Sequence, residues 1–190
     1  MKNVISGLII LFMSILESNA QSTKLDEKNG FNVFVLGSSL KEVKAVASLQ
    51  KLKDNSDKNY IYYGVKNLDK YKLIDNNLSS IQLVFVKDRL LEINLYLSYF
   101  KTAKDKFVST ELAQKISNEY GSWHERELSA VDRSSGLSMK FDITGNNVTL
   151  IRYVFIHTFD NNTFGSYGDR YCFISNQVYR EAEKQKGNGL

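Results

Sequence analysis

Proline is absent from the 190-residue chain, and cysteine and histidine are scarce, with one and two copies. Proline fixes φ and lacks the backbone N–H that donates a hydrogen bond, so no helix or strand of this chain is interrupted by it. The single cysteine, Cys172, cannot form a disulfide within the chain, and it lies in an apolar, strand-like run that is typical of a buried thiol. A disulfide-bonded scaffold is therefore excluded.

The chain also has little excess of one sign of charge. The chain has 25 Lys plus Arg against 21 Asp plus Glu, which gives a formal charge of +4 that is spread along the sequence. Hydrophobic residues make up 43% and charged residues 24%, as in ordinary globular proteins. These values argue against a disordered chain and a nucleic-acid-binding protein, and the length fits one domain.

The N-terminus has the pattern of a secretory signal peptide. Lys2 precedes an apolar run over residues 4–16, and Ser18 and Ala20 place small residues at −3 and −1 of a cleavage site before Gln21. The run is shorter than the roughly 20 residues that a membrane-spanning helix needs. We therefore predict a signal peptide over 1–20, a secreted or periplasmic location, and no integral membrane segment after cleavage. No cysteine lies near the cut, which argues against a lipid anchor.

The rest of the chain is predicted to form a flexible leader over 21–30, a single α+β domain over 31–175, and a C-terminal helix and tail over 176–190. Helices are expected over 39–53, where Ser39 and Glu42 have capping-box spacing, and over 102–120, where Gly121 follows as the stop.

Strands are expected where two-residue alternation replaces the helical period. A strand over 60–65 precedes a hairpin of 81–86 and 90–97, in which Leu91, Ile93, Leu95 and Leu97 share one face. A strand over 128–133 precedes a second hairpin of 137–144 and 148–157, followed by a loop over 158–169 and a short strand over 171–174. The order helix, strand, hairpin occurs twice, which indicates a structural duplication. The predicted fold is an antiparallel sheet with two helices packed on one face.

Aromatic residues make up 12% of the chain. If the two helices cover the aliphatic face of the sheet, the open face carries five residues that we take as a candidate binding site: Tyr62, Val84, Asn94, Tyr96 and Lys140. Tyrosine offers a broad contact area at low entropic cost, which suits a protein or glycan partner. Tyrosine is also common in strands, and a second layer could cover this face.

Catalytic and metal-binding motifs are weak. His124 and His157 lack the spacing of a helical zinc site, and residues 160–165 match a calcium loop poorly. Acid pairs such as Asp132 with Asp142 occur in any chain with this many carboxylates. Residues 37–39 precede a helix and fit a capping turn as well as an anion site. No cofactor or metal is expected.

Three segments resemble the small exported bacterial proteins of the BamE (SmpA/OmlA) and β-lactamase-inhibitor-protein-like α/β class. They are the helix start GSSLKEV from Gly37, the hairpin FVKDRLLEI from Phe85, and the helix end EYG at Gly121. The low proline and high Lys, Asn, Ile and Tyr usage resembles secreted proteins of Bacteroidetes. The resemblance implies a protein that binds other proteins. This chain lacks the lipidated cysteine of the outer-membrane assembly members and the disulfides of the inhibitors.

The sequence thus favours an exported, non-enzymatic protein-binding or inhibitor-like module. Two alternatives stay open: a hydrolase-like enzyme whose acids come from distant strands, and a structural cell-surface component.

Overall fold

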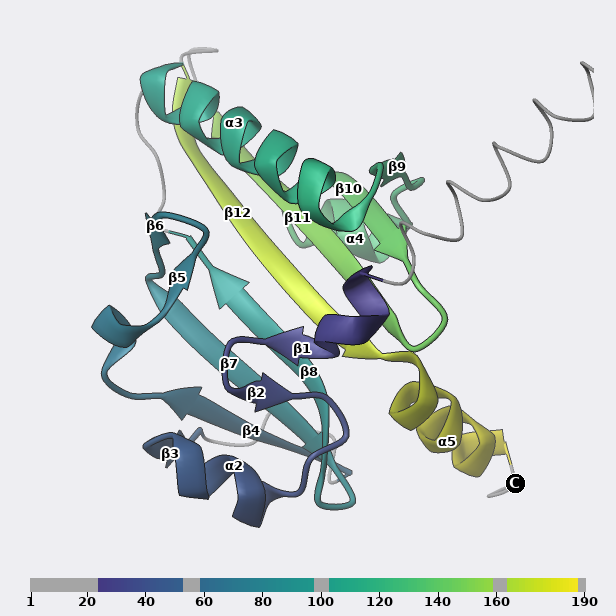
Figure 1. Ribbon diagram of the computed structural model, residues 1–190. Coiled ribbons are helices and arrows are strands. Elements are labelled where there is room, and N and C mark those ends of the chain that lie inside the picture. Colours follow the sequence, from purple (N-terminus) through teal and green to yellow (C-terminus); the bar gives the residue numbers. More distant parts are fainter. Residues whose placement is uncertain (1–23, 53–58, 98–102, 159–163, 188–190) are drawn as a thin grey trace, which may run out of the picture.

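The computed structural model describes residues 24–52, 59–97, 103–158 and 164–187. They form an α+β fold around an eight-stranded antiparallel sheet (Figure 1), which confirms the predicted fold class. The sheet strands are β3 (Leu49–Lys51), β4 (Tyr60–Val65), β7 (Ser80–Val86), β8 (Arg89–Tyr96), β9 (His124–Glu125), β10 (Leu137–Thr144), β11 (Val148–Thr158) and β12 (Phe164–Ser175). The labelled helices are α2 (Leu40–Val46), α3 (Ala103–Tyr120), α4 (Ala130–Ser134) and α5 (Asn176–Gly187), with a 3-10 turn η1 (Leu68–Lys70).

Two small hairpins complete the described elements. One pairs β1 (Gly30–Phe31) with β2 (Phe34–Val35), and the other pairs β5 (Lys72–Leu73) with β6 (Asn76–Asn77). In the part of the chain described here, no helix has the length and apolar character to cross a membrane.

The strand order is β3-β4-β7-β8-β12-β11-β10-β9. Four consecutive sheet strands after α2 form one meander, and four after α3 form another, so the two meet only where β8 pairs with β12. This order supports the predicted duplication, with four strands in each unit where the sequence indicated three. The register at the joint pairs Tyr96 with Arg170 and Ile93 with Phe173.

The main core covers the face that carries Ile93 and Leu95, both fully buried. Val43 of α2 and Ile116 of α3 belong to the same buried cluster. The ring of Tyr120, at the end of α3, lies 6.1 Å from the ring of Phe173 in an edge-on arrangement. We call this the core face of the sheet.

The opposite face is partly covered by α4 and α5. Val178 of α5 packs in a second cluster with Val86 and Leu91, and Ile174 packs against it. Because side chains alternate along a strand, Ile174 and Phe173 point to opposite faces. Figure 1 shows α3 in front of the sheet and α4 behind it. The part of this second face that neither helix covers lies between α4 and α5.

The expectation that Leu91 shares a face with Ile93 is wrong. The pairing of β7 with β8 shifts between Val84 and Phe85, where Leu91 has no partner across the strands. This bulge places Leu91 and Glu92 on the same side, so Leu91 packs under α5 instead of joining the main core.

Residues 24–30 form a helical turn and the start of β1, where a flexible leader over 21–30 was expected. Leu25 is fully buried, because it inserts into the main core. The Asp26 carboxylate accepts hydrogen bonds from the backbone N–H groups of Asn146, Asn147 and Val148, at 2.8, 2.8 and 3.0 Å. The predicted signal peptide over 1–20 lies outside the described residues.

Three further expectations are corrected. The predicted helix over 39–53 ends at Val46, and residues 49–51 form the edge strand β3. The predicted strand over 128–133 is largely the helix α4, because Ser129 and Asp132 form a reciprocal capping box. Residues 164–169, half of the predicted loop over 158–169, belong to β12, which pairs along its length with β11.

Candidate binding face

The five predicted site residues lie on the second face of the sheet, but they differ in exposure. Tyr62, Tyr96 and Lys140 are half-buried. Val84 and Asn94 are 2% and 3% exposed, so these two are not available to a partner. Val84 is flanked across the strands by Tyr62 and Glu92, and its short side chain lies beneath these larger ones. The Asn94 amide donates a hydrogen bond to the Glu92 carboxylate at 3.2 Å.

The structure joins Tyr96 and Lys140 through two residues that were not in the predicted site. Across four neighbouring strands, the paired residues on this face are Tyr96 of β8, Arg170 of β12, Tyr153 of β11 and Lys140 of β10. We call these four residues the cross-strand row.

Cations and aromatic rings alternate along the cross-strand row. The Arg170 guanidinium lies 4.0 Å from the centre of the Tyr153 ring and 5.9 Å from that of Tyr96. The Lys140 ammonium lies 5.6 Å from the Tyr153 ring on the other side. Such contacts contribute about 0.5–2 kcal/mol each, depending on how far water is excluded. The row is therefore held in one arrangement before any partner binds.

The ionisation of the row follows its burial. Burial raises the pKa of Tyr153 to about 12, and the effect outweighs the opposing pull of the Arg170 cation. Burial acts to lower the pKa of Arg170, but hydrogen bonding and Coulomb interaction with Tyr96 outweigh it and raise the pKa. At neutral pH the Tyr153 phenol is therefore neutral and the Arg170 guanidinium is charged.

The Tyr96 hydroxyl extends the row by one strand. It donates a hydrogen bond to the side-chain oxygen of Gln82 on β7 at 3.4 Å. Gln82 is half-buried and pairs with Asn94 across the sheet. A partner that lies across the row would therefore meet polar and aromatic groups from five adjacent strands.

Arg170 and Tyr153 were missed for different reasons. Arg170 follows a stretch that was interpreted as a loop, and its pairing with Tyr96 joins distant parts of the sequence. Tyr153 lies in a hairpin strand that was correctly predicted, and the hairpin register alone places it opposite Lys140. That register was the available signal.

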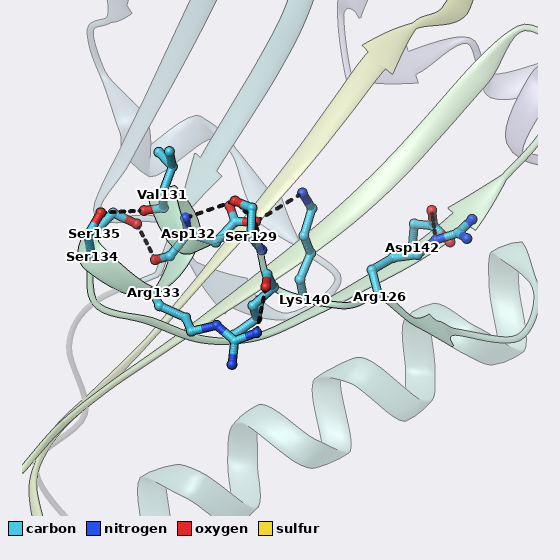
Figure 2. Close-up of polar contacts among 10 residues, drawn as sticks. Arg126, Ser129, Val131, Asp132, Arg133, Ser134, Ser135, Lys140 and Asp142 are labelled. Atoms are coloured by element: carbon cyan, nitrogen blue, oxygen red, sulfur yellow. Dashed lines mark hydrogen bonds and ion pairs between the residues drawn. The ribbon is translucent and has the colours of Figure 1, made fainter.

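A polar cluster borders the row at α4 (Figure 2). The Asp132 carboxylate accepts hydrogen bonds from the backbone and hydroxyl of Ser129 and lies 3.9 Å from the Lys140 ammonium. These hydrogen bonds from Ser129 lower the pKa of Asp132 and keep it ionised. This ion pair connects Lys140 of β10 to α4.

The acid pair Asp132 and Asp142 is not assembled into a site. Figure 2 shows Asp132 directed to Ser129 and Lys140, while Asp142 lies with Arg126 further along β10. The Arg126 Nε atom donates to an Asp142 oxygen at 2.6 Å, which raises the pKa of Arg126. Each carboxylate is thus close to its own cation.

Other candidate chemistry finds little support in the described ranges. No group of three or more His, Cys, Asp and Glu side chains is placed to hold a metal ion there. The Cys172 thiol is 2% exposed, and burial raises its pKa well above the ordinary value, as expected for a packed thiol. The weak calcium-loop match at 160–165 falls mostly outside the described residues.

Comparisons with family models, with curated proteins and with solved structures find no match to this chain. Its function therefore has to be inferred from the residues of the site.

Proposed function

We propose that the chain is an exported, non-enzymatic binding module that docks a protein partner on the second face of its sheet. The observation that carries this proposal is the cross-strand row, because its four side chains are half-buried, held by one another and displayed on strands. Residues fixed before binding lose less entropy when a partner docks.

The composition of the row suits a protein partner. Tyrosine and arginine are enriched among the residues that contribute most to protein interfaces, where they combine apolar area with polar groups. The cations Arg170 and Lys140 favour an acidic or carbonyl-rich surface on the partner. Tyrosine rings also stack on sugar rings, so a glycan is an outcome that the test must separate.

One observation supports the enzyme alternative. His124 pairs with Asp142 across β9 and β10, and Oδ1 of Asp142 is buried without a hydrogen-bond partner. However, Asp142 is only 7% exposed and its other oxygen is bound to Arg126, so substrate access is poor. The binding module is therefore the better supported function.

The test is affinity capture by the immobilised chain from residue 21, using envelope and medium extracts, with mass spectrometry of the retained proteins. Lys140→Glu and Tyr96→Ala should each reduce recovery of the same protein by about fivefold or more, as expected for an interface residue worth about 1 kcal/mol. Tyr179→Ala is the matched control, because Tyr179 is an exposed tyrosine on α5 at 47% exposure.

Three results would contradict the proposal. Recovery that is unchanged by both face variants would show that any partner binds elsewhere. Retention on glycan arrays with no retained protein would identify a glycan-binding module instead. Turnover of a peptide or glycan that is lost in Asp142→Asn and His124→Ala would favour the enzyme.

A further inference from the structure

A small hollow lies at one end of the second face, where β7 begins and β8 ends. Its volume is about 240 Å³. The lining combines Ser79, Ser80, Tyr96 and Arg170 with Leu97, Phe155 and Gly168, and it includes Asp169, whose side chain has no exposed surface. Pockets for drug-sized ligands are larger, at about 300–1,000 Å³, so this one fits a smaller molecule.

Arg170 is a half-buried cation that forms no ion pair with a carboxylate among the described residues. The side chains that act on its pKa are those of Tyr96, Cys172 and Tyr153, none of which is a carboxylate. Its Nε atom is buried and makes no hydrogen bond. The neighbouring acid, Asp169, is on the core face and is bound to Arg152 at 3.0 Å.

Contacts with Tyr96 keep the Arg170 guanidinium charged despite its burial, but no carboxylate in the described part of the chain neutralises that charge. Lys140, on the far side of Tyr153, is a second cation, and it is paired with Asp132 at 3.9 Å. Phe155 lines the same hollow as the guanidinium. An anionic group with an apolar body would supply what this site lacks.

We propose that the hollow beside Arg170 binds a small organic carboxylate, with its anionic end toward the guanidinium and its apolar body against Phe155. A planar carboxylate matches the donor fork of arginine, whereas the mixed lining with one guanidinium is poorly suited to a free phosphate. The carboxylate could come from a free acid or from the C-terminus of a protein chain. This inference deepens the proposed function, because Arg170 and Tyr96 belong to the cross-strand row.

The test is isothermal titration of the chain from residue 21 with pairs of probes that differ only in charge. The pairs are hexanoate with hexanamide, and N-acetylphenylalanine with its primary amide; inorganic phosphate is a fifth probe. We expect saturable 1:1 binding of at least one acid, tenfold or more tighter than its amide, because an added charge-assisted hydrogen bond supplies about that factor.

Two variants locate the binding. Arg170→Gln should weaken acid binding at least about tenfold and remove the preference over the amide. Ser80→Phe keeps the guanidinium and fills the hollow from an exposed position, so it should abolish binding of both members of a pair. Lys41→Gln, an exposed cation on α2, is the matched control and should leave binding unchanged. If thermal melts show that Arg170→Gln does not fold, Ser80→Phe decides the result.

The outcomes distinguish the two sources of the carboxylate from each other and from the results that would overturn the proposal. Tighter binding of N-acetylphenylalanine than of hexanoate supports the proposal with a chain terminus as the source, and the reverse order supports it with a free acid. Equal binding of acid and amide, phosphate binding as tight as that of the acids, or no binding at all overturns it. Any of these would leave partner capture through Tyr96 and Lys140 standing as a separate result.

Discussion

Asp26 connects the start of the domain to the turn between β10 and β11, and its replacement by alanine tests how much this connection stabilises the fold. Its carboxylate accepts hydrogen bonds from three backbone N–H groups, those of Asn146, Asn147 and Val148. A hydrogen bond to a charged group contributes about 1.5–3 kcal/mol. The three bonds share one acceptor group and two are exposed, so we expect a total loss of about 2–4 kcal/mol for Asp26→Ala rather than the sum.

The assay is urea unfolding of the chain from residue 21, followed by circular dichroism. In a thermal melt of a protein of this size, the expected loss of stability would lower the Tm by roughly 4–16 °C. Glu27→Ala is the matched control, because Glu27 is the adjacent acid and is exposed. An Asp26→Ala protein that unfolds at the same urea concentration as Glu27→Ala would refute the reasoning. Gly145→Ala should mimic the loss, since a Cβ atom there would lie 2.4 Å from Oδ1 of Asp26.

Three further predictions concern the sheet. Asp169→Asn should destabilise the protein by about 3–5 kcal/mol, because it removes the carboxylate that is paired with the buried Arg152 cation; urea unfolding against Asp75→Asn, an exposed acid, measures this, and equal midpoints would contradict it. Since the pKa of Tyr153 is raised to about 12 from about 10, the unfolded chain ionises first, so stability present below pH 10 should decline between pH 10 and 12. Tyr153→Phe should reduce that decline, and an unchanged pH profile would argue against the assigned burial. Ile93→Ala should cost about 2–5 kcal/mol, because Ile93 is fully buried, and a loss below 1 kcal/mol would remove it from the core.

Local sequence patterns predicted the elements that local forces determine. The two hairpins follow from alternation on both sides of a turn, and at Lys87 and Asp88 both φ angles are positive, at 49° and 63°, as a tight hairpin turn requires. The long helix Ala103–Tyr120 follows from its four-residue spacing, and Gly121 ends it with a φ of 124°.

Elements that depend on distant contacts were not predictable in the same way. Alternation in β12 is obscured by glycine and polar residues, and only pairing with β8 and β11 fixes it as a strand. At the bulge the adjacent Leu90 and Leu91 break the alternation, but the regular spacing of Leu91, Ile93 and Leu95 still favours the wrong face for Leu91. For the same reason the sequence placed Tyr96 and Lys140 on one face but could not show that Arg170 lies between them.

The single joint between the two meanders bears on how the chain folds. Each hairpin can close soon after its residues are synthesised, whereas β8 cannot pair with β12 until nearly the whole domain has been made. Contacts between distant residues are formed slowly, because a long loop has to close first. Until then the edge of β8 presents unpaired backbone groups that can bind another chain. We therefore expect the pairing of β8 with β12 to limit the folding rate and to set the period in which the protein is most prone to aggregate.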